Sequence, residues 1–197
     1  MREGGRLIDP TETHMTDFLV LYASTHGHTA KIAERVAQTV RSAGAVAHVS
    51  DVHAASDLDL SDYDAVIVGA SVHGGRHQRE VCGWIKRHTS ELRAMPSAFF
   101  SVCLTAADDT NESRAASRKY IDELVEETGW APDEIVTFAG ALQYREYDFA
   151  TRLVMRLLMK HGHHETDTSR DYDYTDWDAV DSFGYGCVAM VERVATA

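Results

Sequence analysis

The stretch LVLYASTHGHTAKIAERV, residues 19–36, changes its hydrophobic pattern halfway along. Its first part is a continuous apolar run, which is typical of a β-strand buried on both faces. Beyond Thr29, apolar residues recur at every fourth position as far as Val40, and Gly44 follows as a helix stop signal. We therefore expect a strand, a short polar turn with the sequence STHGHT (residues 24–29) and an amphipathic helix.

The composition is that of one folded domain. The chain has 197 residues, 44% of them hydrophobic, so it can bury a sizeable core. No apolar run approaches the ~20 residues that span a bilayer. Residues 1–15 lack the apolar centre of a signal peptide and are typical of a disordered leader, with Met15 as an alternative start. We expect a single domain over residues 16–197.

Charge and cysteine usage restrict the partners and the compartment. Acidic residues outnumber basic ones by 31 to 19, giving a formal net charge of −12. Such a surface repels nucleic-acid backbones, so we expect no nucleic-acid partner. Cys82, Cys103 and Cys187 form no CxxC pair, which favours reduced thiols and a cytoplasmic location.

Apolar strands alternate with amphipathic helices along the chain. We expect strands at residues 17–23, 45–50, 63–70, 97–104 and 134–142, and later helices at 77–95, 112–128 and 177–194. This alternation predicts an α/β protein whose parallel sheet is covered on both faces. Five strands suit the flavodoxin-like doubly wound order 2-1-3-4-5.

One connection is much longer than the others. It forms an insertion over about residues 143–175, before the last helix, where ~2–6 residues are usual. Periodicity predicts a helix over 149–161 with an apolar face and a stripe of basic residues, Arg152, Arg156 and Lys160. An insertion of this length is usually functional.

The turn STHGHT occupies the position where open α/β sheets bind ligands. Helix N-termini there point unsatisfied N–H groups outward, which suits a phosphate even without a lysine. Gly27 allows close approach, and the hydroxyls of Ser24, Thr25 and Thr29 could donate beside the backbone. The plainer interpretation, with Thr29 as an ordinary N-cap in a simple turn, stays open.

Absent motifs exclude several phosphate-binding and hydrolytic classes. The chain has no GxxxxGK[ST], no GxGxxG and no GxSxG. A receiver domain of the same topology needs an aspartate at the end of the third strand, where this chain has Gly69-Ala70-Ser71.

Two further loops should open at the same edge, SVHGGRH (residues 71–77) and SVCLTAADD (101–109). One loop for a phosphate and two that bracket a planar ring are the layout of a flavin mononucleotide (FMN) site. The main-chain N–H of Gly74 or Gly75 could stabilise the reduced ring. The candidate cofactor-binding residues are Ser24, Thr25, His26, Gly27, His28, Thr29, Ser71, Val72, His73, Gly74, Gly75, Ser101, Val102, Cys103, Leu104, Thr105 and Ala106.

The first loop resembles the flavodoxin phosphate loop, S/T-x-T-G-x-T, with His26 at the third position. A closer resemblance rests on PSAFFSVCL, AGALQY, RLLMK, ETDT and YTDW, which occur in this order along the chain. In these motifs the chain is similar to the flavodoxin-fold, quinone-dependent protoporphyrinogen dehydrogenases of haem biosynthesis, from about Met15 to the final helix.

The resemblance implies an FMN enzyme that oxidises protoporphyrinogen IX to protoporphyrin IX and passes the electrons to a membrane quinone. A peripheral contact with the cytoplasmic face of the inner membrane through residues 147–161 and a homo-oligomer both stay open. Propionates of the substrate or anionic lipids could pair with Arg145, Arg152, Arg156 and Lys160. Alternatively, the apolar face of the insertion packs on the domain and its basic residues are solvated.

For proton transfer, the candidates are His73 and His77, because imidazole titrates near neutral pH. Either could instead be a solvent-facing loop histidine. A cluster near the end of the insertion is better explained as a polar loop than as a metal site, because no second group of ligands follows: His161, His163 and His164.

Two other functions stay open. A flavodoxin-like electron carrier would serve partner oxidoreductases, and an NAD(P)H:quinone reductase would take electrons from a nicotinamide. Carriers commonly screen the flavin ring with aromatic residues, and the three predicted loops contain no Trp, Tyr or Phe. That absence favours an enzyme that stacks a substrate on the ring.

Overall fold

The computed structural model describes residues 15–56, 58–108, 110–142 and 170–195. The expected leader, apart from Met15, lies outside the described residues. So do the insertion helix predicted at 149–161 and its four basic candidates, Arg145, Arg152, Arg156 and Lys160.

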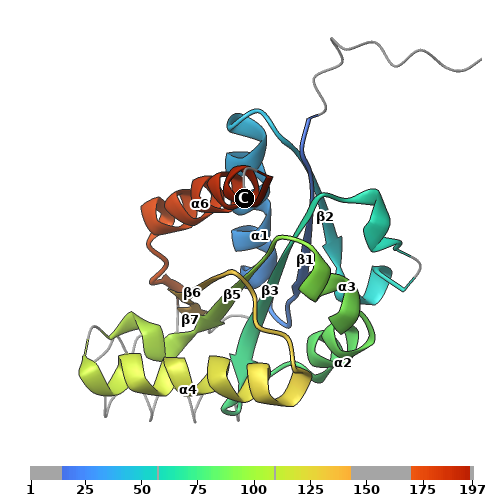
Figure 1. Cartoon of the computed structure of the whole chain (residues 1–197). Coiled ribbons are helices and arrows are strands. Elements are labelled where there is room, and N and C mark those ends of the chain that lie inside the picture. The colour runs from blue at the N-terminus through green and yellow to red at the C-terminus, as the bar shows by residue number, and fades with distance from the viewer. Residues whose placement is uncertain (1–14, 57, 109, 143–169, 196–197) are drawn as a thin grey trace, which may run out of the picture.

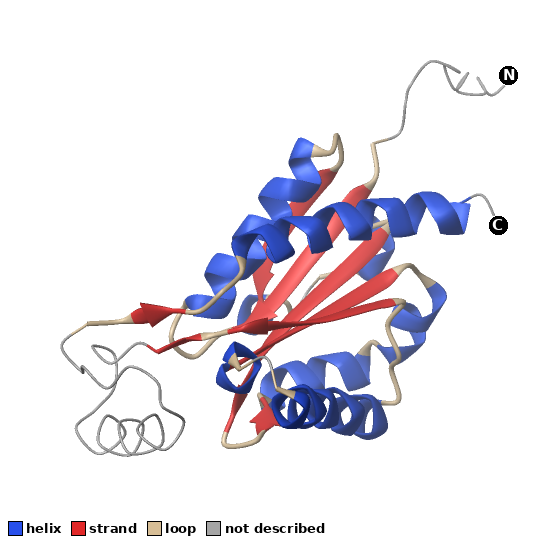
Figure 2. Cartoon of the chain, turned by 90° about the vertical axis from the view of Figure 1, so that its left-hand side faces the viewer, coloured by secondary structure: helices blue, strands red, loops and turns tan. Residues whose placement is uncertain are grey.

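A parallel sheet of five strands forms the centre of the molecule (Figures 1 and 2). The strands are β1 (Asp17–Ala23), β2 (Val46–Asp51), β3 (Ala65–His73), β5 (Ser97–Cys103) and β6 (Glu134–Ala139). Their spatial order is β2-β1-β3-β5-β6, which confirms the predicted doubly wound order. A right-handed crossover helix between parallel strands produces this arrangement.

Helices cover both faces of the sheet. One face carries α1 (His28–Ser42) and α6 (Trp177–Ala195); the other carries α2 (Arg79–Arg87), α3 (Thr89–Ala94) and α4 (Asn111–Thr128) (Figure 2). Short 3-10 turns occur at η1 (Val52–Ala54), η2 (Leu60–Asp62) and η3 (Leu104–Ala107). Among the described helices, none is both long and apolar enough to cross a membrane.

Each face of the sheet has its own apolar core. Alternate residues of β1 divide between them: Phe18 packs with α1 and α6, whereas Leu19 packs with Trp84 of α2. Both residues are fully buried. Each strand must supply apolar side chains to both cores at once, and this explains the continuous apolar runs in the sequence.

The structure corrects three expected boundaries. The helix expected at 77–95 is divided into α2 and α3, because the backbone of His88 (φ −111°, ψ 17°) leaves the helical region. The strand expected at 63–70 continues to His73 and returns as β4 (Arg76–His77). The strand expected at 134–142 breaks at Gly140, after which β7 (Ala141–Leu142) pairs with β8 (Tyr172–Asp173) in a separate sheet.

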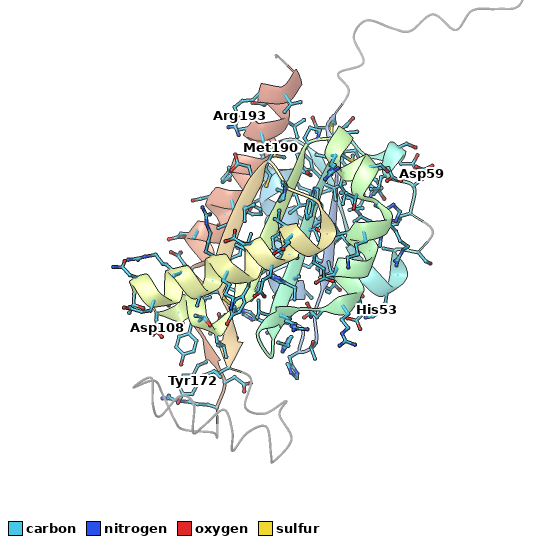
Figure 3. All side chains as sticks on the ribbon, turned by 60° about the horizontal axis from the view of Figure 1, so that its bottom comes forward. His53, Asp59, Asp108, Tyr172, Met190 and Arg193 are labelled. Carbon is cyan, nitrogen blue, oxygen red and sulfur yellow. The ribbon has the colours of Figure 1, made fainter. Side chains whose placement is uncertain are left out.

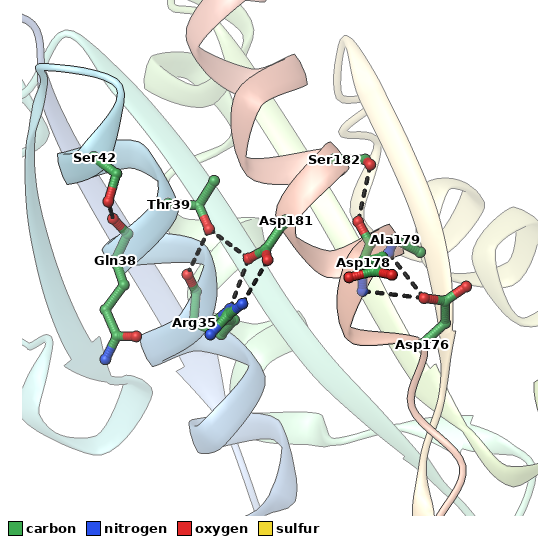
Figure 4. A network of polar contacts seen from close by, with 9 residues as sticks. All are labelled: Arg35, Gln38, Thr39, Ser42, Asp176, Asp178, Ala179, Asp181 and Ser182. Atoms are coloured by element: carbon green, nitrogen blue, oxygen red, sulfur yellow. Dashed lines mark hydrogen bonds and ion pairs between the residues drawn. The ribbon is translucent and has the colours of Figure 1, made fainter.

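A polar contact joins the two helices on the first face (Figure 4). The guanidinium of Arg35 on α1 donates to both carboxylate oxygens of Asp181 on α6, at 2.7 and 2.6 Å. The Thr39 hydroxyl is 2.7 Å from the same carboxylate, beside the buried backbone of Gly184. This bidentate geometry fixes the position of α1 against α6, and with it the loop that precedes α1.

Gly69 on β3 lies directly beneath the ring of Phe100. A Cβ at position 69 would be 2.0 Å from the Phe100 Cζ, so the ring would have to move within a packed core. We expect Gly69→Ala to lower the free energy of unfolding by about 3 kcal/mol, which urea denaturation measures.

Gly186 is the matched control, because a Cβ there meets no heavy atom within 4 Å. It lies inside α6, so Gly186→Ala should raise stability by about 0.5–1 kcal/mol. Equal stability of the two variants would contradict the close packing of Phe100 on β3.

Candidate functional site

The carboxyl ends of the central strands lie in register. Ala23 of β1 is paired with Ala70 of β3, and Ala70 with Ser101 of β5. The segments that leave these strands therefore open at one edge of the sheet, as predicted from their order. They are the β1–α1 loop (residues 24–27), the β3–β4 hairpin and η3. Figure 3 brings this edge toward the viewer.

The first turn of α1 has no side-chain cap. Its N-cap residue is Gly27, in the left-handed conformation (φ 78°), and no side chain in the described ranges caps its free N–H groups. By contrast, Thr110 and Ser113 form a reciprocal capping box at the start of α4. The uncapped N–H groups of α1, with the positive end of the helix dipole, favour a bound anion.

The six residues of STHGHT divide by exposure. Thr25 and Gly27 are exposed, and Ser24 and His26 are partly exposed. His28 and Thr29 are buried, with 7% and 2% of their surface exposed. A Cβ at Gly27 would meet open space, so the backbone there is accessible to a ligand. The loop thus offers main-chain donors and short polar side chains, which is the donor set that a phosphate requires.

His28 connects the start of α1 to a segment 147 residues further along the chain. Its Nε2 is 2.7 Å from the Thr175 hydroxyl, which itself donates to the main-chain oxygen of Ala139 at 2.9 Å. Because the hydroxyl proton is used in that bond, His28 must donate its Nε2 proton to Thr175. Burial lowers the pKa of His28, while the Asp173 carboxylate, 3.6 Å away, partly offsets this shift.

The segment around Thr175 also brings aromatic rings to this region. Tyr172 and Tyr174 stack at 6.4 Å with nearly parallel planes, and Trp177 meets His28 edge-on at 6.1 Å. The backbone of Tyr174 donates to Gly140 beyond the end of β6. Figure 3 shows Tyr172 at the carboxyl end of the sheet. The three loops contain no Trp, Tyr or Phe. The aromatic side chains of this edge come instead from the distant segment around Thr175.

Gly74 and Gly75 form a two-residue β-turn, not an open loop. Both have positive φ values, 57° and 81°, which glycine adopts without strain. The turn pairs His73 with Arg76. Sequence reasoning missed this hairpin, although two glycines between β-forming residues are a known hairpin signal.

Side chains of the hairpin alternate between two surroundings. On one face, Gln78 donates to the Ser71 hydroxyl at 2.8 Å and to the Thr25 hydroxyl at 3.3 Å, and accepts from the Ser71 N–H at 3.0 Å. The same face carries His73, whose Nε2 is 3.1 Å from the Ser71 hydroxyl and whose ring is 5.8 Å from that of His26. The hairpin and the β1–α1 loop are thereby held together.

The two candidate proton-transfer residues have different environments. His73 is exposed, and its pKa is lowered, first by partial desolvation and then by the neighbouring His26. His77, on the opposite face, is 8% exposed and its Nε2 is 2.9 Å from the Ser101 hydroxyl. Burial lowers the pKa of His77 to about 4. The alternative of a solvent-facing histidine is therefore wrong for His77, which is a buried neutral link to β5.

The remaining candidates lie at the end of β5. Ser101, Val102 and Cys103 are buried in the strand, so accessible surface begins only with the half-buried η3 residues Leu104, Thr105 and Ala106. In the part of the chain that the structure describes, no group of three or more His, Cys, Asp or Glu could hold a metal ion. The histidines at 161, 163 and 164 lie outside that part.

This architecture matches the Flavodoxin domain family over residues 19–169. The chain belongs to the flavodoxin family. Membership implies a flavin cofactor, and the uncapped helix, the exposed Gly27 backbone and the flanking hairpin fit one. The fold also resembles that of oxidised Flavodoxin 1 from Bacillus cereus, with a TM-score of 0.53 at 18% identity over 88% of this chain and 98% of that one.

Two curated relatives of this flavodoxin-family protein are similar along most of the chain. Protoporphyrinogen IX dehydrogenase [quinone] from Leishmania major is 36% identical over 87% of this chain and 74% of its own length. The protein of the same name from Escherichia coli K12 is 33% identical over 89% of this chain and 96% of its own length.

Removing the Thr175 hydroxyl should reveal how strongly the two distant segments are joined. Thr175→Val keeps the shape but leaves the buried His28 Nε2–H and the Ala139 oxygen without their partner. We expect a loss of about 1–3 kcal/mol in the free energy of unfolding, measured by urea denaturation. Thr175→Ser retains the hydroxyl and should lose less; a Val variant as stable as the Ser variant would refute the connection.

Proposed function

We propose that this chain is an FMN-dependent enzyme that oxidises protoporphyrinogen IX to protoporphyrin IX and transfers the electrons to a quinone. The observation that carries this proposal is the likeness to proteins named Protoporphyrinogen IX dehydrogenase [quinone], which extends over 87–89% of the chain. At 33–36% identity the likeness is one of sequence and is not restricted to a common fold. The geometry of the edge agrees with it.

The β1–α1 loop would hold the FMN phosphate through main-chain N–H groups of residues 24–29 and the hydroxyls of Ser24 and Thr25. The hairpin turn and η3 would lie on either side of the ring. When bound, the flavin supplies the redox chemistry, taking hydride equivalents from the substrate and giving them to the quinone. The protein contributes position and electrostatics.

Oxidation of the macrocycle also releases protons, and His73 would accept one of them. It is exposed at the rim of the site, and its lowered pKa keeps the imidazole neutral at pH 7. Its ring is oriented by the Ser71 hydroxyl, which Gln78 holds in turn. His77 is buried and bonded to Ser101, so it would position the hairpin rather than exchange protons.

The ring pair of Tyr172 and Tyr174, with the Arg170 guanidinium 4.9 Å from the centre of the Tyr172 ring, would offer a bulky macrocycle an aromatic surface beside a cation at the same edge. Basic residues 145, 152, 156 and 160, the membrane contact through 147–161, a location on the inner membrane and self-association stay predictions, because no described residue bears on them.

Anaerobic reduction of the FMN-loaded protein tests the proposal. Bleaching of the yellow flavin by protoporphyrinogen IX, followed by reoxidation with a quinone, is the expected result. Bleaching by NADPH but not by protoporphyrinogen IX would identify a nicotinamide-linked quinone reductase. Bleaching only through a partner reductase would identify an electron carrier. Either of these last results would overturn the proposed substrate.

A pH profile isolates the role of His73. A general base must be neutral, so activity should rise with pH through the His73 pKa, with a midpoint below its ordinary value near 6.5. His73→Gln should remove this limb of kcat/KM against pH and lower kcat about 100-fold.

The matched control is His53→Gln, which changes another exposed histidine, on η1. It should leave the profile unchanged. An unaltered acidic limb in His73→Gln would rule His73 out as the base.

A further inference from the structure

Arg76 is an exposed cation at the rim of the site and has no polar partner among the residues that the structure describes. It follows the two-glycine turn and pairs directly with His73 across the hairpin, so both side chains belong to the same face. That face is the one whose His73 ring meets His26 of the β1–α1 loop. Within the described ranges, Arg76 forms no hydrogen bond or ion pair, although an arginine offers five donors.

Arg79 adds a second cation to the same edge. It is the first residue of α2, is exposed, and likewise has no ion pair among the residues that the structure describes. A positive charge at a helix N-terminus opposes the helix dipole, so Arg79 does not stabilise α2 by its charge. Glu80 is the acidic residue in this first turn. Neither arginine therefore makes a polar contact that holds the described part of the fold together.

These two cations stand out against the charge of the chain. A formal net charge of −12 repels an anionic substrate at long range. An enzyme acting on such a substrate needs local positive groups near its site, and arginine suits a carboxylate because its two N–H groups can bind both oxygens. Arg76 and Arg79 satisfy this requirement at the edge where His26 and His73 meet.

We propose that Arg76 and Arg79 form the subsite that binds a carboxylate of the substrate macrocycle. This inference rests on the proposed function, because protoporphyrinogen IX carries two propionates. It assigns the recognition of one propionate to the β3–β4 hairpin and the start of α2, a different set of residues from the basic residues of the insertion. Main-chain groups of the β1–α1 loop remain the contacts of the cofactor phosphate.

Binding measurements with the reaction product can separate recognition of its carboxylates from contact with its macrocycle. Protoporphyrin IX and its dimethyl ester share the macrocycle, but the ester has no carboxylate. Each is titrated into the FMN-loaded full chain in the same detergent, and quenching of protein fluorescence gives Kd. The variants are Arg76→Gln, Arg79→Gln and the double variant, with thermal unfolding of each as a folding check.

The double variant should bind the diacid about tenfold more weakly, and each single variant about threefold, while affinity for the ester is unchanged. Arg87→Gln is the matched control, since Arg87 is exposed on the last turn of the same helix, at the other end of α2 from Arg79. It should alter neither titration.

Equal losses for the diacid and the ester, no loss for either, or a loss confined to FMN affinity would each overturn the subsite. A loss of sedimentation with anionic vesicles, with porphyrin affinity intact, would assign the arginines to a membrane and overturn it too. Assays of the native chain distinguish failure of the subsite from failure of the proposed function. If it oxidises protoporphyrinogen IX but the variants bind the diacid normally, only the subsite fails; if it neither binds nor oxidises porphyrins, the proposed function fails with it.

Discussion

Among the described residues, no side chain caps the N–H groups at the start of α1, and the arrangement of the edge depends on this fact. A helix that begins in this way favours an anion at its first turn. β1 fixes the place of that turn, because its residues pack into both cores, and the Arg35–Asp181 contact fixes the direction of the helix. The loop can therefore be short and lysine-free and still present its donors in a defined position.

Segments far apart in sequence complete the edge. Thr175 accepts from His28 and donates to Ala139, so one hydroxyl joins the first helix, the last strand of the sheet and the segment before α6. The side-chain amide of Gln78 similarly joins the hairpin to the β1–α1 loop, because it donates to the hydroxyls of Ser71 and Thr25. Bonds to a buried hydroxyl such as that of Thr175 are costly to break one at a time, since each leaves an unsatisfied partner. They make the edge a rigid support for a flat cofactor.

Local sequence patterns were sufficient for most of the fold. The apolar runs and the helical periodicity predicted all five parallel strands, and their alternation with helices predicted the order in the sheet. The STHGHT turn and the two later loops were correctly expected at one edge, because parallel strands place their carboxyl ends together. These features depend on a few neighbouring residues or on general topology.

Features that depend on particular long-range contacts could not be predicted in this way. Nothing near His28 indicates a bond to Thr175, and nothing near Leu142 indicates its pairing with Tyr172. The burial of His77 follows from its alternation along the hairpin, which becomes evident only once the glycine turn is recognised. The exposed partner on that hairpin, His73, looked equivalent in sequence and has the opposite environment.

The central claim is that the uncapped turn of α1 binds a phosphate, and a comparison of two flavins tests it most directly. FMN and riboflavin share the ring and the ribityl chain and differ only in the phosphate. Titration of the flavin-free protein, followed by flavin fluorescence, should give a Kd for FMN at least 100-fold below that for riboflavin, or about 2.7 kcal/mol. Equal affinities for the two flavins would contradict the account.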